Sequence, residues 1–258
     1  MAKLPPFPGT SGRREWRTAF DAVRKLLANG DDTAQVFRIM RALNVGNVAR
    51  NYARLLATEQ GGRIAYDRVE LATRFSEPAF VARFAPGTVG AAYRAFLEST
   101  GYSADGLVDV SKVAPMLDDM AHPYAWFGRR VRDCHDIWHV LTGYKADESL
   151  GEAALVAFSY AQVRGLGWAV IGVSAALKSL KVTGGPLFAK AVWEGYRNGR
   201  RAQWISGEDY LQLLDEPLDA ARVRLGIRKP VAYLRAQREL GEELASYLST
   251  PKPKPLAA

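Results

Sequence analysis

Apolar residues recur at helical spacing almost throughout the chain, and this periodicity restricts the fold more than any other feature. Alternation of apolar and polar residues, which would indicate a strand, is not found over four or more positions between turn signals. The sequence therefore predicts an all-α fold with many helices. Two sets of residues show the pattern, each on one helix face: Trp16, Phe20, Val23 and Leu27, and Val89, Tyr93, Phe96 and Leu97.

Glycine and proline divide this pattern into separate elements. No internal repeat or Pro/Ser-rich linker interrupts residues 11–248, so we expect residues 1–248 to form a single domain. Proline alternates with lysine in residues 249–258, which we expect to be a disordered tail. The expected helices are 12–29, 33–43, 45–58, 69–83, 87–99, 123–142, 149–163, 165–180, 185–204, 217–225 and 231–248. We expect helices to end at Gly30, Gly61-Gly62, Gly101, Gly143 and Gly184-Gly185, and one helix to begin at Pro217.

Composition narrows the functional classes. The chain is 48% hydrophobic and 24% charged, which excludes a disordered or fibrous protein. A lone cysteine, Cys134, excludes a disulfide framework and a thiolate metal cluster and fits a reducing compartment. The longest uncharged apolar stretch, residues 165–177, has 13 residues, whereas a spanning helix needs ~20. We therefore expect no membrane span, and the N-terminus lacks the apolar region of a secretory signal.

The chain is basic. Its 35 Lys and Arg against 27 Asp and Glu give a net charge of +8 and a pI near 9.6, which favours an anionic partner. We find no zinc-finger spacing or aromatic-basic RNA motif, so nucleic acid is not expected. The first helix is suited to an anionic membrane surface, although an ordinary amphipathic helix docked on the core would look the same. Its basic residues are Arg13, Arg14, Arg17, Arg24 and Lys25, beside Trp16, Phe20, Leu26 and Leu27.

Two of the three histidines lie in the run Cys134-His135-Asp136-Ile137-Trp138-His139. On a helix, the imidazoles of His135 and His139 share one face, about 6 Å apart along the axis at ~1.5 Å per residue. A single divalent ion can bridge them, so we expect a metal site here. Asp136 lies at the edge of this face, where its carboxylate can ligate the ion or orient a histidine.

Glu152 is the candidate ligand from the next helix. Residues 143–147 fit a turn, and antiparallel packing of the following helix would return Glu152 toward the histidines. Ser149 and Glu152 also have the Ser-x-x-Glu spacing of a capping box, in which the glutamate binds backbone N–H and no metal. The spacing leaves both interpretations open.

Three other kinds of site fit this run less well. A thermolysin-like peptidase needs Glu directly after the first histidine, where this chain has Asp136. A His-Asp phosphohydrolase needs further ligands far away in sequence, but the remaining histidine, His122, is only 13 residues upstream. Cys134 and His135 are helix neighbours that point ~100° apart, so we expect Cys134 to be a small buried residue rather than a nucleophile.

The segment 132–139, with Gly143 and Leu150-Gly151-Glu152, resembles the His-Asp-x-x-His plus downstream Glu signature of the ubiquinone (coenzyme Q) biosynthesis Coq-four family, bacterial type. Residues 84–90, and Val192-Trp193-Glu194 with residues 199–202, resemble further family segments, and the resemblance covers about 70–228. The family pattern has eleven residues between the second histidine and the glutamate, whereas this chain has twelve, 140–151. The extra residue falls in a turn, where insertions are tolerated.

The resemblance implies an all-helical protein with one divalent ion, zinc favoured and iron or cobalt as alternatives. The implied ligands and catalytic residues are His135, Asp136, His139 and Glu152. Two functions are implied: C1 decarboxylation of a polyprenylated 4-hydroxybenzoate, with or without coupled oxygenation, or non-catalytic organisation of other ubiquinone-biosynthesis enzymes by a lipid-binding scaffold. We expect a cytoplasmic protein, peripheral on the inner membrane, with homo-oligomer formation left open.

Four further residues are candidate substrate contacts. Arg132, Arg200 and Arg201 are candidate anchors for a substrate carboxylate or a lipid phosphate, because guanidinium binds either bidentately. A solvated basic surface is the alternative. Trp138 could line a prenyl pocket or belong to the core.

Overall fold

The helical periodicity is realised throughout the described part of the chain. The computed structural model describes residues 12–30, 32–104, 121–181 and 184–241, and these contain helices but no strand. The helices are α1 (Trp16–Ala28), α2 (Thr33–Leu43), α3 (Asn47–Leu56), α4 (Glu59–Asp67), α5 (Leu71–Phe75), α6 (Pro78–Ala82), α7 (Val89–Thr100), α9 (Pro123–Asp133), α10 (His135–Thr142), α11 (Ser149–Val163), α12 (Leu166–Ser179), α13 (Gly185–Arg201), the 3-10 turn η1 (Ile205–Gly207), α14 (Tyr210–Leu213), α15 (Leu218–Arg224) and α16 (Val231–Leu240).

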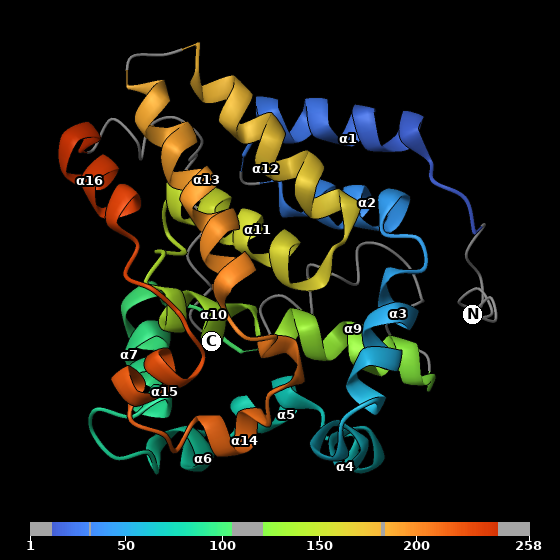
Figure 1. Cartoon of the computed structure of the whole chain (residues 1–258), viewed down its shortest axis with the longest axis vertical. Helices are drawn as coiled ribbons and strands as arrows, with labels where there is room; N and C mark the ends of the chain where they lie inside the picture. The colour runs from blue at the N-terminus through green and yellow to red at the C-terminus, as the bar shows by residue number, and fades with distance from the viewer. Residues whose placement is uncertain (1–11, 31, 105–120, 182–183, 242–258) are drawn as a thin grey trace.

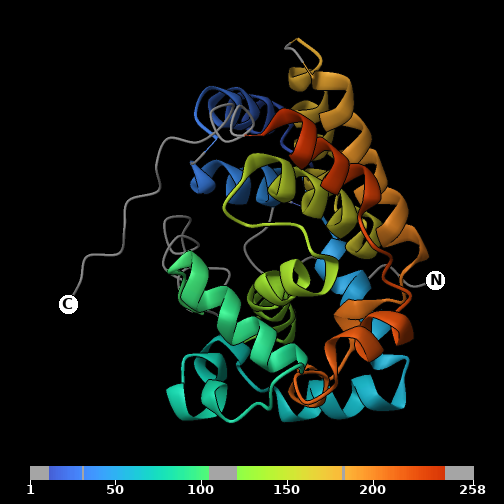
Figure 2. The same cartoon turned by 90° about the vertical axis from the view of Figure 1, so that its left-hand side faces the viewer.

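The helices form two groups with α10 between them (Figure 1). In the upper group of Figure 1, α1 and α2 pack against α12, and α11, α12 and α13 pack against one another. The lower group contains α4 to α7, α14 and α15, and Figure 2 shows the same division from the side. Because α10 contacts both α7 and α11, residues on α10 can meet side chains from either group.

Helices α11 and α13 approach each other unusually closely. A Cβ at Gly195 would overlap the carbonyl oxygen of Ala154, and one at Gly199 would approach that of Phe158 to 2.5 Å. Glycine is therefore required at both positions, four residues apart on one face of α13. The close approach gives a structural reason for the glycine in segment 199–202, one of the segments that resemble the family. It also fixes the position of α11, the helix that carries Glu152.

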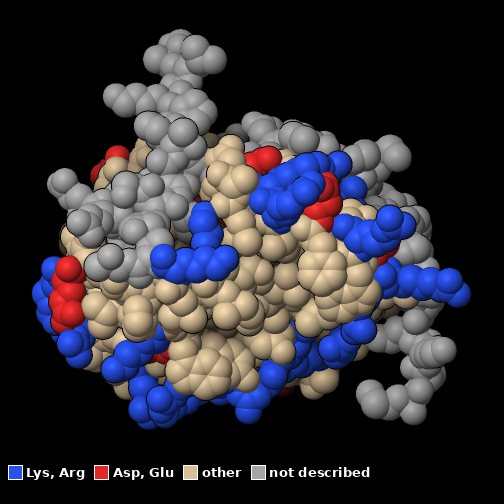
Figure 3. All heavy atoms as spheres, turned by 90° about the horizontal axis from the view of Figure 1, so that it is seen from above, with Lys and Arg blue, Asp and Glu red and all other residues tan. Residues whose placement is uncertain are grey.

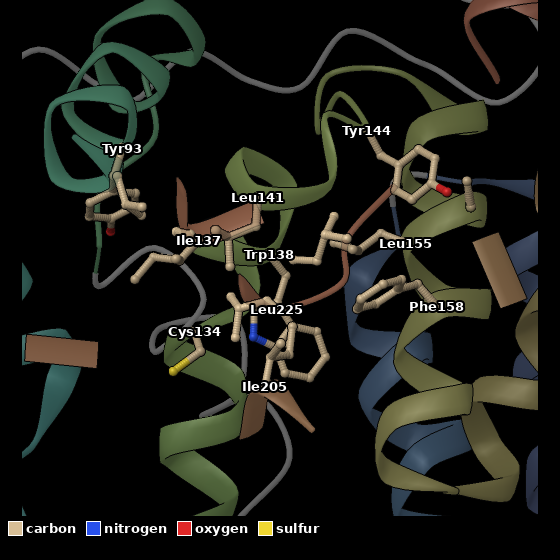
Figure 4. Close-up of a cluster of buried hydrophobic side chains, with 14 of the residues drawn as sticks. Tyr93, Cys134, Ile137, Trp138, Leu141, Tyr144, Leu155, Phe158, Ile205 and Leu225 are labelled. Carbon is tan, nitrogen blue, oxygen red and sulfur yellow. The ribbon is translucent and has the colours of Figure 1, made fainter. Parts of the chain in front are cut away.

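The segment expected as one helix over 123–142 is two helices. Cys134 separates α9 from α10, with φ −82° and ψ −7°. The carboxylate of Asp133 accepts a hydrogen bond from the Ala72 backbone N–H at 3.2 Å, which anchors the end of α9 at the start of α5. Figure 4 shows that α10 then directs Ile137, Trp138 and Leu141 into the buried core.

Other boundaries differ for local reasons. The expected helix 69–83 is interrupted between α5 and α6, because Pro78 begins α6 and disfavours helical geometry in Glu77. The stop expected at Gly61-Gly62 was wrong, since both glycines lie inside α4, which Thr58 caps. Helix α13 ends at Arg201 rather than at 204, and η1 and α14 follow it.

The C-terminal part of the expected domain is described only as far as Gly241. Helix α16 ends at Leu240, with Gly241 as its C-cap. The rest of the expected helix to 248 and the tail 249–258 lie outside the described residues. Within the described ranges, no helix is both long and apolar enough to cross a membrane.

Candidate metal centre

The two histidines of α10 share one face, as their spacing predicts. His135 is the first residue of α10 and His139 lies one turn later. Their ring centroids are 4.7 Å apart, with the rings nearly perpendicular at 77°. Both side chains are largely or fully buried, with 16% exposure for His135 and 0% for His139.

Helix α11 brings Glu152 to this pair. The Glu152 carboxylate lies 3.9 Å from Nε2 of His135 and 3.7 Å from Nε2 of His139. One ligand atom from each of the three residues lies within 4.8 Å of the others, so small side-chain rotations would bring all three onto one cation at ligand distances of about 2.0–2.2 Å. Three protein ligands of the type N, N and O suit a divalent metal.

The capping-box interpretation of Glu152 was wrong. Ser149 is the first residue of α11 and Glu148 is its N-cap, with no side-chain cap hydrogen bond. Glu152 is therefore one position beyond the N3 site that a capping box requires. The structure directs its carboxylate to the histidines instead.

His139 is oriented by the loop after α10. Its Nδ1 lies 2.8 Å from the carbonyl oxygen of Tyr144, and because a carbonyl only accepts, Nδ1 carries the proton and donates. In the neutral imidazole, Nε2 then presents a lone pair on the Glu152 side. This Nε2 is buried and has no hydrogen-bond partner among the described residues. An unsatisfied buried acceptor costs about 1–3 kcal/mol, which a bound cation would remove.

Asp136 stands behind His135 rather than among the converging ligand atoms. Its Oδ1 lies 3.5 Å from Nδ1 of His135, on the side of the ring away from the nitrogen that faces Glu152. Of the two roles expected for Asp136, ligating the ion or orienting a histidine, this position matches the orientation of His135. Burial, reinforced by this nearby carboxylate, raises the pKa of Tyr93 on α7.

The loop between α10 and α11 is held on both sides, a feature that sequence reasoning missed. A Cβ at Gly151 would overlap the carbonyl oxygen of Lys145, so glycine lets the loop lie on α11. From α16, the Tyr233 hydroxyl accepts from the Lys145 backbone N–H at 3.0 Å and donates to Glu148. No local pattern could have connected Tyr233 to a loop 88 residues earlier.

Aromatic side chains of α7 and the following residues pack against His139. The Phe96 ring of α7 stacks on His139 with centroids 6.0 Å apart, and Tyr102 packs edge-on against Phe96. Helix α7 is fixed at its start by Thr88, whose side chain accepts from Ala91 N–H, and by Gly90 packed on the Phe84 ring. The family-like segment 84–90 therefore positions the aromatic wall of the site.

The four expected substrate contacts have different surroundings in the structure. Arg132 binds the buried Asp133 carboxylate at 2.8 Å. Trp138 is a core residue, 2% exposed, and its indole N–H donates to the Tyr210 hydroxyl at 2.6 Å. Arg200 and Arg201 are exposed at the end of α13, beside the Gly199 contact with α11, about 9 Å along that helix from Glu152.

Cys134 is buried, 1% exposed, as expected for a structural cysteine. Its burial raises the pKa of the thiol, so the thiolate needed for nucleophilic attack is disfavoured. The structure therefore gives no support to a Cys/His catalytic pair.

Comparison with known proteins identifies the family of this chain. Residues 22–231 match the family model described as "Coenzyme Q (ubiquinone) biosynthesis protein Coq4", beyond the 70–228 region of the sequence resemblance. The chain is 31% identical over 219 residues to "Ubiquinone biosynthesis protein coq4, mitochondrial" of Pyrenophora tritici-repentis, covering 83% of this chain and 68% of that protein. A mouse COQ4 homolog, also named mitochondrial, is 27% identical over 188 residues, covering 68% of this chain and 64% of the mouse protein.

The fold also resembles a solved structure. A protein from Nostoc punctiforme PCC 73102, described as a proposed ubiquinone biosynthesis protein, superposes with a TM-score of 0.60 at 21% sequence identity. The match covers 84% of this chain and 100% of that one. At this identity, the comparison supports the all-helical fold.

Proposed function

The chain belongs to the Coq4 family of coenzyme Q (ubiquinone) biosynthesis proteins, and we propose that it removes the ring C1 carboxylate of a polyprenylated 4-hydroxybenzoate precursor. The observation that supports a chemical role is the convergence of His135, His139 and Glu152 within 4.8 Å. The buried, unpaired Nε2 of His139 supports it further, because such an atom suits a cation better than solvent.

These three residues would hold one divalent ion. Zinc fits two imidazoles and a carboxylate, and iron or cobalt are the alternatives. When bound, the ion would supply Lewis-acid stabilisation of negative charge on the substrate carboxylate or phenolate. Asp136 stays in this proposal as the residue that orients His135, with the catalytic set being His135, Asp136, His139 and Glu152.

The side chains of the site have separate tasks. The Tyr144 carbonyl keeps a proton on Nδ1 of His139, so its Nε2 faces Glu152. Phe96 covers His139 and excludes water from that side. The Glu152 side chain is 38% exposed, so a substrate carboxylate would approach beside it. Breakage of the C1–carboxyl bond releases CO2 and leaves its electron pair on the ring carbon, where a proton completes the product. In the oxidative alternative, dioxygen and a proton add to that carbon, and the resulting hydroperoxide loses water to leave a quinone.

The substrate class places this reaction at a membrane surface. A polyprenylated aromatic lipid partitions into the bilayer, so the protein would act peripherally on an anionic membrane, together with other ubiquinone-biosynthesis enzymes. We propose the cytoplasmic face of the inner membrane, whereas the fungal and mouse relatives are named mitochondrial. The alternative function is a lipid-binding scaffold without catalysis.

A turnover assay separates the two functions. Purified, metal-loaded protein is incubated with a prenylated 4-hydroxybenzoate labelled with carbon-13 at the carboxyl group, and labelled CO2 is measured by mass spectrometry, with and without dioxygen. Release that is lost in His139→Ala but kept in His122→Asn supports the enzyme. His122 is the matched control because its side chain caps α9, a task that Asn also performs. Binding of the lipid without CO2 release would support the scaffold.

A further inference from the structure

Helix α12 has an unusual composition for a surface helix. Among its residues, Leu166 to Ser179, only Lys178 is charged. A helix that is apolar on all sides is normally buried, yet Val173 and Leu177 are 57% and 60% exposed, and Leu180 follows at 53%. One side of α12 packs on α11 through Gly172, and the other side is an uncovered apolar strip.

The helices next to α12 also carry exposed apolar side chains. Lys178 donates to the Leu27 carbonyl of α1, and Ser179 donates to the Gly185 carbonyl of α13, so the three helices adjoin. Each neighbour adds exposed aromatic side chains. We define the α12 face by its exposed large apolar residues: Trp16 and Phe20 of α1, Val173, Leu177 and Leu180, and Trp193 of α13.

The charge of the protein is concentrated on the same helices. Residues 12–30, 166–181 and 184–201 carry 11 Lys and Arg and 3 Asp and Glu. This excess equals the +8 of the whole chain, so the remaining residues are neutral overall. Figure 3 shows this end of the molecule, where mostly uncharged residues occupy the middle and most of the Lys and Arg side chains lie toward the edge.

We propose that the α12 face rests on an anionic bilayer surface. The inference rests on the membrane location proposed above and adds the surface that makes the contact. Apolar and aromatic side chains enter the interface while Lys and Arg around them meet lipid phosphates. At ~1.5 Å per residue, α12 is too short to span a bilayer and would lie in its plane.

Charge favours a membrane over a second copy of the chain. A two-fold interface brings the same surface of both copies together. The basic rim of one copy would then face the basic rim of the other, whereas a bilayer containing phosphatidylglycerol offers the opposite charge.

Flotation with vesicles tests the proposal. The protein is mixed with vesicles of phosphatidylcholine, alone or with phosphatidylglycerol, at low and high salt. We expect Val173→Gln with Leu177→Gln to weaken partitioning roughly a hundredfold, on the order of tenfold per apolar side chain. Arg17→Gln with Lys181→Gln should weaken it about fivefold per charge on the anionic vesicles only.

Matched controls lie elsewhere on the molecule. Val223→Gln changes an 82% exposed valine of α15, and Arg228→Gln with Lys229→Gln removes two exposed charges before α16. These variants should bind as the parent protein does. Equal binding by the α12-face variants would overturn the proposal, as would loss of a dimer, measured by sedimentation, in place of loss of vesicle binding.

The same variants distinguish this proposal from the proposed activity. With a water-soluble, short-chain prenylated substrate and no vesicles, the α12-face variants should keep the metal content and turnover of the parent protein. Normal metal content also shows that the variants are folded. Vesicle binding without turnover in the parent protein would reject the decarboxylase and leave the docking surface standing.

Discussion

Nδ1 of His139 lies 2.8 Å from the carbonyl oxygen of Tyr144, five residues further along the chain. The contact makes the loop after α10 responsible for the tautomer and direction of an imidazole of the candidate metal site. The acceptor is a backbone atom, so no side-chain substitution in the loop removes it directly. Apart from replacement of His139 itself, the contact can be disturbed only by moving the loop, so the residues that hold the loop become testable parts of the site.

The first prediction is that the purified protein binds about one divalent ion. His135→Ala and His139→Ala should each abolish most of this binding, because each removes one of only two nitrogen ligands. Elemental analysis by mass spectrometry measures the content, and His122→Asn serves as the control. Full occupancy in either alanine variant would contradict the assignment.

The second prediction concerns Glu152. Glu152→Gln replaces a charged ligand with a weak neutral one and should lower metal affinity at least tenfold. Ser149→Ala should leave the metal bound and change stability by less than the ~1 kcal/mol of a lost cap, since Ser149 makes no cap hydrogen bond. Calorimetric metal titration and thermal unfolding measure the two effects. Unchanged affinity in Glu152→Gln would remove this residue from the site.

The third prediction is that Tyr233 acts on the metal through the loop. Tyr233→Phe removes the hydroxyl that contacts Lys145 N–H and Glu148, which should cost about 1 kcal/mol of stability. It should also weaken metal binding on the order of tenfold. Tyr66→Phe, at an 88% exposed tyrosine, is the control. A loss of stability with unchanged metal affinity would show that the loop is positioned without Tyr233.

The fourth prediction is that alanine substitutions at two helical glycines, Gly151 and Gly62, have opposite effects on stability. Gly151→Ala places a methyl group against the Lys145 carbonyl oxygen and should cost about 1–3 kcal/mol, with weaker metal binding because the loop is displaced. Gly62→Ala, where a Cβ meets nothing within 4 Å, should instead stabilise the protein by about 0.5–1 kcal/mol. Denaturant unfolding compares them. Equal stability of the two variants would contradict the close approach.

The fifth prediction concerns the pH dependence of thiol reactivity. An exposed cysteine reacts faster as pH rises through ~8.5, where its thiolate forms. Burial raises the pKa of Cys134, so the folded protein should stay unreactive toward iodoacetamide between pH 7 and pH 9, because the reactive thiolate does not form. In urea, the same thiol should be alkylated, as measured by intact mass. Rapid alkylation of the folded protein at pH 7 would reopen a nucleophilic role.

Local interactions explain what could be predicted from the sequence. Helical periodicity depends on residues three and four apart, and so does the shared face of His135 and His139. The C-terminal stop at Gly143, with φ 76°, follows from the backbone freedom of glycine alone. These features need no knowledge of distant residues.

The sequence by itself determined an all-helical chain and a histidine pair facing one way, because a 3.6-residue repeat is a property of neighbours. The tertiary structure alone decided that Glu152 is directed to the pair, that Tyr233 contacts the loop before α11, and that the exposed side of α12 remains on the surface. Each outcome depends on contacts between helices, and their free energy comes from burial and from hydrogen bonds across long sequence separations. No local pattern carries that information.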